Sequence, residues 1–112
     1  MELDSSYIDD IQIISVRESR IDSAGAIRFK DAMRAAVAEG AARVVLDLSQ
    51  VGFVDSSGLG AIVALMKFLG PERKLDLAGL TPDVDKVFRL TRMDTVFGIY
   101  RDVDTAISRA AG

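Results

Sequence analysis

The chain has 112 residues, of which 49% are hydrophobic and 28% are charged, and this suits one globular domain over residues 1–112. Its formal net charge of −3 argues against direct binding of nucleic acid through a basic surface. The chain has no cysteine, which excludes disulfides and thiol nucleophiles. It also has no histidine, so it lacks the usual general base of a serine hydrolase and the commonest transition-metal ligand.

The N-terminal residues predict a β-hairpin. Residues 1–7 favour a first, irregular strand, and Ile8-Asp9-Asp10 is typical of a turn. Residues 11–16 carry isoleucine and valine and predict a second strand whose core face changes along its length. Residues 17–20 form a charged connection to the next element.

The next segment predicts a helix over residues 24–39. Either Asp22 or Ser23 can cap its N-terminus, because both side chains accept hydrogen bonds from free backbone N–H groups. Gly40 suits the position after its C-terminus. Four apolar residues share one face at helical spacing, and we expect this face to enter the core: Phe29, Met33, Ala36 and Val37.

Residues 43–70 predict a strand, a short polar loop and a helix. The strand is expected from an apolar run that suits burial on both faces: Val44, Val45, Leu46 and Leu48. The helix is expected from apolar residues at spacings of three and four: Leu59, Ile62, Val63, Met66 and Leu69. Gly70-Pro71 ends this helix, since proline cannot continue it. Open α/β folds place functional residues in loops of this kind.

The C-terminal part repeats the alternation of strands and helices. Residues 75–78 predict a strand, and a helix follows with Thr81 as its cap and Pro82 in its first turn. Residues 96–100 predict the last strand. Asp102 is expected to cap a final helix whose apolar stripe combines Val103, Ala106, Ile107 and Ala110.

The order of these elements predicts the fold class. Strands that alternate with helices indicate a mostly parallel sheet, and the first two strands add an antiparallel hairpin. We therefore expect an α/β fold with a mixed sheet and about four α-helices.

The loop before the central helix carries two serines. A serine immediately before an apolar helix can cap it, so Ser56 or Ser57 is expected to accept a backbone N–H. The positive end of the helix dipole also tolerates an added phosphate, and Ser56 is a hydroxyl that can be exposed on a rigid support. Gly58 and Gly60 keep the first turn free of bulky side chains, so another surface can approach closely.

Residues 44–63, VVLDLSQVGFVDSSGLGAIV, resemble the signature of the STAS domain, and specifically that of the anti-sigma factor antagonists. The most specific part is Phe53-Val54-Asp55-Ser56-Ser57-Gly58-Leu59-Gly60, and the resemblance covers nearly the whole chain. It includes Arg20-Ile21-Asp22, similar to the family's "G-x-L-D" turn, although Arg20 departs from the residues usual there. The resemblance implies a single STAS-like domain.

The same resemblance implies the function. Family members bind an anti-sigma factor that is also a serine protein kinase, and this releases a sigma factor or another target. The kinase then phosphorylates the serine after the aspartate, here Ser56, which weakens the complex, and a serine phosphatase restores the free hydroxyl. Such a protein is not an enzyme. Further residues are expected to form the partner-binding surface: Asp22, Ser23, Asp55, Ser57, Gly58 and Leu59.

Several of these residues also have a structural interpretation. Asp55 can interact with the helix dipole instead of a partner. Asp47 is more easily explained as a hydrogen-bonded residue near a strand end than as a catalytic carboxylate. The Lys67-Phe68 pair at the far end of the central helix is explained by a division between core and solvent.

Two other functions stay open. A STAS scaffold subunit of a stressosome-like or lipid-transport complex would leave Ser56 unmodified. A small serine-dependent or nucleotide-hydrolysing enzyme is disfavoured, because histidine and a G-x-x-x-x-G-K-[ST] loop are both absent.

No apolar run approaches the roughly 20 residues that span a membrane, and Met1-Glu2-Leu3-Asp4 lacks the basic start of a secretory signal. We expect a cytoplasmic protein without membrane contact, metal or cofactor.

Overall fold

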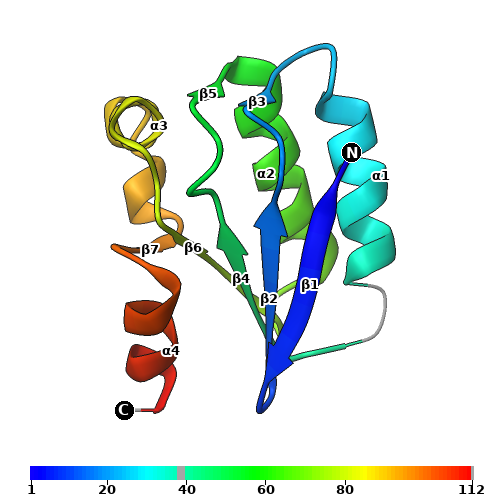
Figure 1. Cartoon of the computed structure of the whole chain (residues 1–112), viewed down its shortest axis with the longest axis vertical. Helices are drawn as coiled ribbons and strands as arrows, with labels where there is room; N and C mark the ends of the chain where they lie inside the picture. The colour runs from blue at the N-terminus through cyan, green and yellow to red at the C-terminus, as the bar shows by residue number, and fades with distance from the viewer. Residues whose placement is uncertain (38–39, 112) are drawn as a thin grey trace.

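The computed structural model describes residues 1–37 and 40–111 and shows strands flanked by helices (Figure 1). The elements follow in this order: β1 (Leu3–Ile8), β2 (Ile11–Val16), β3 (Arg20–Ile21), α1 (Ala26–Ala36), β4 (Arg43–Asp47), β5 (Phe53–Val54), α2 (Ser56–Leu69), β6 (Lys74–Ala78), α3 (Pro82–Leu90), the 3₁₀ helix η1 (Met93–Thr95), β7 (Gly98–Tyr100) and α4 (Val103–Ala111).

The main sheet has five strands in the order β1-β2-β4-β6-β7. β1 and β2 are antiparallel, while every other neighbouring pair is parallel. The predicted α/β class, the mixed sheet and the N-terminal hairpin are therefore confirmed. β1 is a regular strand and not the irregular one expected: it pairs with β2 from Leu3 to Ile8, and a tight turn at Asp9 and Asp10 joins them, with Asp9 at φ 53°.

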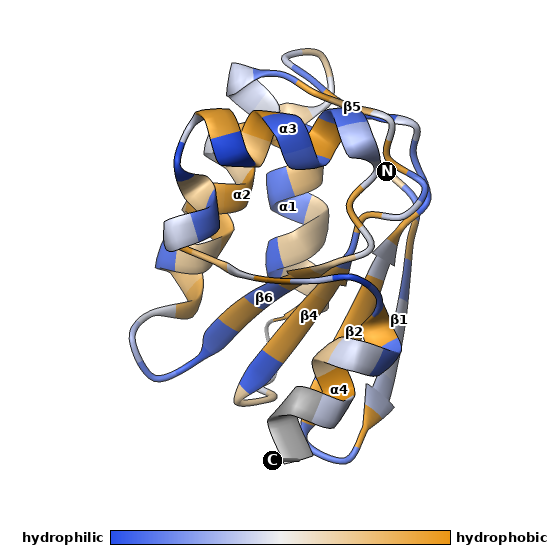
Figure 2. Ribbon diagram, turned by 90° about the vertical axis from the view of Figure 1, so that its left-hand side faces the viewer, coloured by the Kyte–Doolittle hydropathy of each residue, from blue (hydrophilic) through white to orange (hydrophobic). Residues whose placement is uncertain are grey.

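Helices cover both faces of the sheet, but unequally. On one face α1, α2 and α3 enclose the main core, whose largest buried side chains include Phe29, Phe88 and Met33. On the other face α4 packs alone, and its Ala106 lies with Ile11, Ile13, Val45 and Ala78 in a second, smaller core. Figure 2 shows α4 separated from α1 and α2 by the strands.

The boundaries of α1 differ from the prediction. Neither Asp22 nor Ser23 caps α1, because the chain makes a turn before the helix begins. In this turn the Asp22 carboxylate accepts a hydrogen bond from the backbone N–H of Gly25, and Gly25 is the N-cap residue. The C-cap is Val37 and not Gly40, and the predicted end at Glu39 lies outside the described residues. The predicted buried face is confirmed for Phe29, Met33 and Val37, with Ala36 partly buried beside them.

The remaining helices confirm some of the expected caps and correct others. Asp102 caps α4 as predicted, with its Oδ1 2.7 Å from the backbone N of Thr105. Thr81 occupies the N-cap position of α3, but its hydroxyl donates to the carbonyl of Val51 instead of capping the helix. Val103, Ala106 and Ile107 face the sheet as predicted, while the side chain of Ala110 lies outside those described.

Two features of the central helix and its surroundings were not expected. Phe68 is exposed and not part of the core, and the guanidinium of Arg34 from α1 lies 5.5 Å from its ring centroid. The short strands β3 and β5 pair outside the main sheet. Within the described part of the chain, no helix has both the length and the apolar character needed to cross a bilayer.

Candidate functional site

The pairing of β3 with β5 builds the candidate site. Arg20 lies opposite Phe53, and Ile21 lies opposite Val54 in parallel register. Backbone hydrogen bonds extend this contact on both sides, from Gly52 N to Ser19 O at 2.9 Å and from Asp55 N to Ile21 O at 3.4 Å. The loop before α1 is therefore held against the loop before α2, two segments about 30 residues apart in sequence. This brings the predicted residues Asp22 and Ser23 beside Asp55.

Asp55 is the residue that joins the two loops. Its Oδ1 accepts a hydrogen bond from the backbone N of Gly58 at 2.8 Å and caps α2. Its Oδ2 accepts from the backbone N of Ser23 at 3.0 Å. The predicted serine cap is thus wrong: a carboxylate accepts two N–H groups here, and the serines enter the helix behind it. Both Asp55 oxygens have internal partners, while its contact with another protein stays a prediction.

Ser56 and Ser57 occupy the first two positions of α2, and both are exposed. Exposure therefore does not distinguish the two serines. Among the residues that the structure describes, neither hydroxyl takes part in a hydrogen bond. A phosphate on either oxygen would lie at the positive end of a helix of 14 residues, where negative charge is stabilised.

The two glycines of this turn have different roles. Gly58 is buried, and a Cβ atom added to it would overlap the carbonyl oxygen of Ile21. The close approach expected at Gly58 is thus made by the chain's own backbone. Gly60 is exposed, and a Cβ there would meet no atom within 4 Å. Leu59 is partly buried and packs against the main core, so only part of its side chain is available to a partner.

Arg20 and Phe53 form a stack that the sequence analysis missed. The Arg20 guanidinium carbon lies 4.2 Å from the Phe53 ring centroid, and its Nε lies 3.1 Å from Asp22 Oδ2. The Arg20 hydrogen bond lowers the pKa of the Asp22 carboxyl, against an opposing effect of desolvation. The sequence carries no local signal for this stack, because the stack depends on the pairing of two strands of two residues each.

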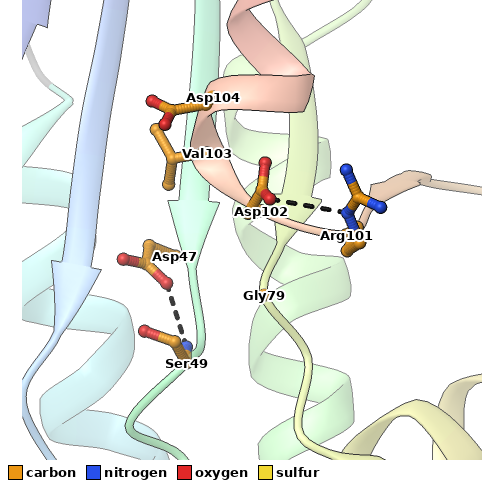
Figure 3. Close-up of a pocket in the computed structure, with 7 residues that line it drawn as sticks. All are labelled: Asp47, Ser49, Gly79, Arg101, Asp102, Val103 and Asp104. Carbon is orange, nitrogen blue, oxygen red and sulfur yellow. Dashed lines mark hydrogen bonds and ion pairs between the residues drawn. The ribbon is translucent and has the colours of Figure 1, made fainter.

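A pocket of about 430 Å³ lies elsewhere, beyond the ends of β4 and β6 and beside α4 (Figure 3). Two of its three carboxylates serve the fold. Asp47 accepts hydrogen bonds from the Ser15 hydroxyl and the Ser49 backbone N, as its structural interpretation predicted. Asp102 caps α4. Within the described residues, no group of three acidic side chains is arranged to hold a metal ion.

Comparison with known proteins places this arrangement in context. The family model of the STAS domain matches residues 3–106. The Bordetella bronchiseptica protein named "Putative anti-sigma factor antagonist BtrV" is 29% identical over 107 residues, which cover 95% of this chain and 91% of that protein.

Solved structures show the same fold. An anti-sigma factor antagonist from Mycobacterium paratuberculosis superposes with a TM-score of 0.88 at 28% identity, covering 99% of this chain and 94% of that one. The Bacillus cell fate determinant SpoIIAA in its phosphorylated form gives a TM-score of 0.70 at 19% identity, with 97% of this chain and 99% of that one covered.

Proposed function

The chain belongs to the STAS domain family, and on that premise we propose that it is an anti-sigma factor antagonist that acts by partner switching in the cytoplasm. Its unphosphorylated form binds an anti-sigma factor that is also a serine protein kinase and thereby releases the kinase's target. The kinase transfers the γ-phosphoryl group of ATP to Ser56 Oγ, with release of ADP and the hydroxyl proton. The complex then weakens, and a serine phosphatase hydrolyses the phosphate ester. The chain itself catalyses neither step.

The observation that carries this proposal is the setting of Ser56. Its side chain is exposed and makes no hydrogen bond with any residue that the structure describes, whereas its neighbour Asp55 is fixed by two hydrogen bonds. A kinase can therefore reach the hydroxyl without unfolding the loop. The support beneath it is rigid, because Gly58 is in close contact with Ile21 of the β3 strand. The phosphate would change the surface and leave the fold intact.

Electrostatics supports the direction of the switch. A phosphate adds about −1.5 to −2 charges and three acceptor oxygens. It would stand beside the carboxylates of Asp55 and Asp22, so the local surface becomes strongly anionic and costly to desolvate. A loss of about 3 kcal/mol at the interface weakens binding roughly 100-fold, which is sufficient for switching. The phosphorylated form of SpoIIAA, a neighbour of the same fold, supports the view that this fold tolerates a phosphate.

Kinase labelling tests the proposal. We propose to recover the bound kinase with the unmodified chain as bait, to identify it by mass spectrometry, and to incubate it with ATP and three forms of the chain. The wild type and Ser57→Ala should gain one phosphate at Ser56, whereas Ser56→Ala should bind the kinase and gain none. Ser57→Ala is the matched control, because both serines are exposed in the same turn. Labelling that maps to Ser57 would overturn the assignment.

A further inference from the structure

Arg20 is a cation placed beside the modification site with most of its donors unused. Its side chain is 57% exposed, and its Nε is engaged by Asp22 at 3.1 Å. Among the described residues, its two Nη groups make no hydrogen bond. The guanidinium lies over the ring of Phe53, and Phe53 precedes Ser56 by three residues.

The pairing of β3 with β5 limits how far Ser56 can lie from Arg20. Arg20 lies opposite Phe53, and Ser56 follows Phe53 by three residues, which span at most about 10 Å even when fully extended. The loops cannot separate easily, because Asp55 binds the backbone of Ser23. A phosphate on Ser56 would extend from the serine and so reduce the separation between this residue and the Arg20 guanidinium. The flexible arginine side chain can move to contact the phosphate.

A phosphate would compete well with Asp22 for the guanidinium. It carries more charge than a carboxylate and offers three acceptor oxygens, and arginine binds such groups with two parallel hydrogen bonds. The present contact with Asp22 uses Nε alone, and both side chains are partly exposed. An exposed ion pair of this kind contributes little free energy, so it exchanges readily.

We propose that Arg20 exchanges its partner when Ser56 is phosphorylated, leaving the Asp22 carboxylate and binding the phosphate. This inference rests on the proposed function, since it needs a phosphate on Ser56. The exchange stabilises the phosphorylated form and leaves Asp22 without its counter-ion. The exchange adds no charge of its own: it uncovers the Asp22 carboxylate before α1 while it covers part of the phosphate charge before α2, so the added negative charge is spread over both loops.

The test uses protein in which phosphoserine is incorporated at position 56 during translation, so that no kinase is needed. The pKa of the phosphate, ordinarily about 6, is measured by a phosphorus NMR titration. A nearby cation lowers this pKa. We expect Arg20→Gln to raise it by about half a unit or more, and Arg20→Lys to restore part of the difference. The neighbouring carboxylates Asp22 and Asp55 are present in all these forms.

Arg89→Gln is the matched control. Arg89 is also 57% exposed and also pairs with an aspartate, Asp85, at 2.9 Å, but it lies on α3. Its replacement should leave the phosphate pKa unchanged, which separates a direct contact from a change in net charge. The exchange would be overturned if the phosphate pKa were equal in wild type and Arg20→Gln. It would also be overturned if Arg20→Gln and Arg89→Gln shifted the phosphate pKa equally.

The two proposals fail separately. If the recovered kinase does not label Ser56, the proposed function fails, while the titration of the encoded phosphoserine still measures the Arg20 contact. If labelling succeeds and the titration shows no Arg20 effect, only the exchange is wrong. A circular dichroism melt of each variant verifies that it is folded. If Arg20→Gln does not fold, the comparison of wild type with Arg20→Lys still tests the exchange.

Discussion

Two ion pairs in different parts of the molecule contrast in their surroundings. Arg43 and Asp76 meet at 2.6 Å beneath α4, with side-chain exposures of 13% and 0%, whereas Arg20 and Asp22 meet at 3.1 Å beside Ser56 with exposures of 57% and 25%. Arg43 also donates to the carbonyl of Ala106 in α4. The buried pair has a fixed geometry and attaches a helix, while the exposed pair is free to exchange partners.

Gly98 shows how closely the buried pair is enclosed. A Cβ atom at this position would overlap Asp76 Oδ1, so the strand beside the carboxylate needs a residue without a side chain. Arg43 is covered on its other side by Tyr100, whose ring centroid is 5.7 Å from the guanidinium carbon. Around Ser56 the same kinds of group are left accessible. The two pairs therefore differ in whether solvent and other molecules can reach their charged groups.

The largest effect is expected from breaking the buried pair. Asp76→Ala leaves the Arg43 guanidinium mostly buried without its counter-ion, and we expect a loss of about 3 kcal/mol in the free energy of unfolding. Urea denaturation measures this loss. Asp22→Ala, which breaks the exposed pair, is the comparison and should cause a much smaller change. Equal losses in the two variants would refute the contrast between the pairs.

A smaller effect is expected at the contact between the two loops. Gly58→Ala forces a methyl group against the backbone of Ile21, which cannot move without separating β3 from β5, and should cost about 2 kcal/mol. Gly60→Ala, two residues later in the same helix, meets empty space and should raise the melting temperature slightly, since alanine favours the helix. A thermal melt that ranks the two variants in the opposite order would contradict this account.

Loss of the carboxylate that joins the loops should have a moderate effect. Asp55→Ala removes the cap of α2 and the contact with Ser23, at a cost of about 1 kcal/mol. Asp55→Asn keeps an acceptor and should recover most of this loss. Chemical denaturation of both variants measures the difference. If Asp55→Ala is as stable as wild type, the cap is not important for the loop.

The smallest effect concerns pH. Arg20 lowers the pKa of Asp22 in the folded protein, so the stabilisation is present above the ordinary carboxyl pKa and is lost as the pH falls through the lowered value. In Arg20→Gln the Asp22 pKa should rise toward its ordinary value. A carbon NMR titration of the Asp22 carboxyl measures the shift, and an unchanged pKa would show that the ion pair is absent in solution.

The sequence predicts the parts of this fold that depend on local patterns. The apolar run ending at Leu48 marks a buried strand, and the strands and helices that alternate around it identify the α/β class. The cap of α2 was misassigned, because serine and aspartate both cap helices and only the tertiary contact with Ser23 favours Asp55. The pairing of Arg20 with Phe53 has no local signal either, since it joins two strands of two residues across 33 positions. The resemblance in sequence identified Ser56 as the candidate, and the structure adds its exposure.

The most direct test of the account is the affinity of the recovered kinase for the unmodified chain and for the chain with phosphoserine at position 56. We expect the phosphorylated form to bind roughly 100-fold more weakly, at a cost of about 3 kcal/mol, with a melting temperature close to that of the unmodified form. Ser56→Asp should show a smaller loss of affinity, because a carboxylate carries less charge than a phosphate. Equal affinities for the phosphorylated and unmodified forms would contradict the partner switch.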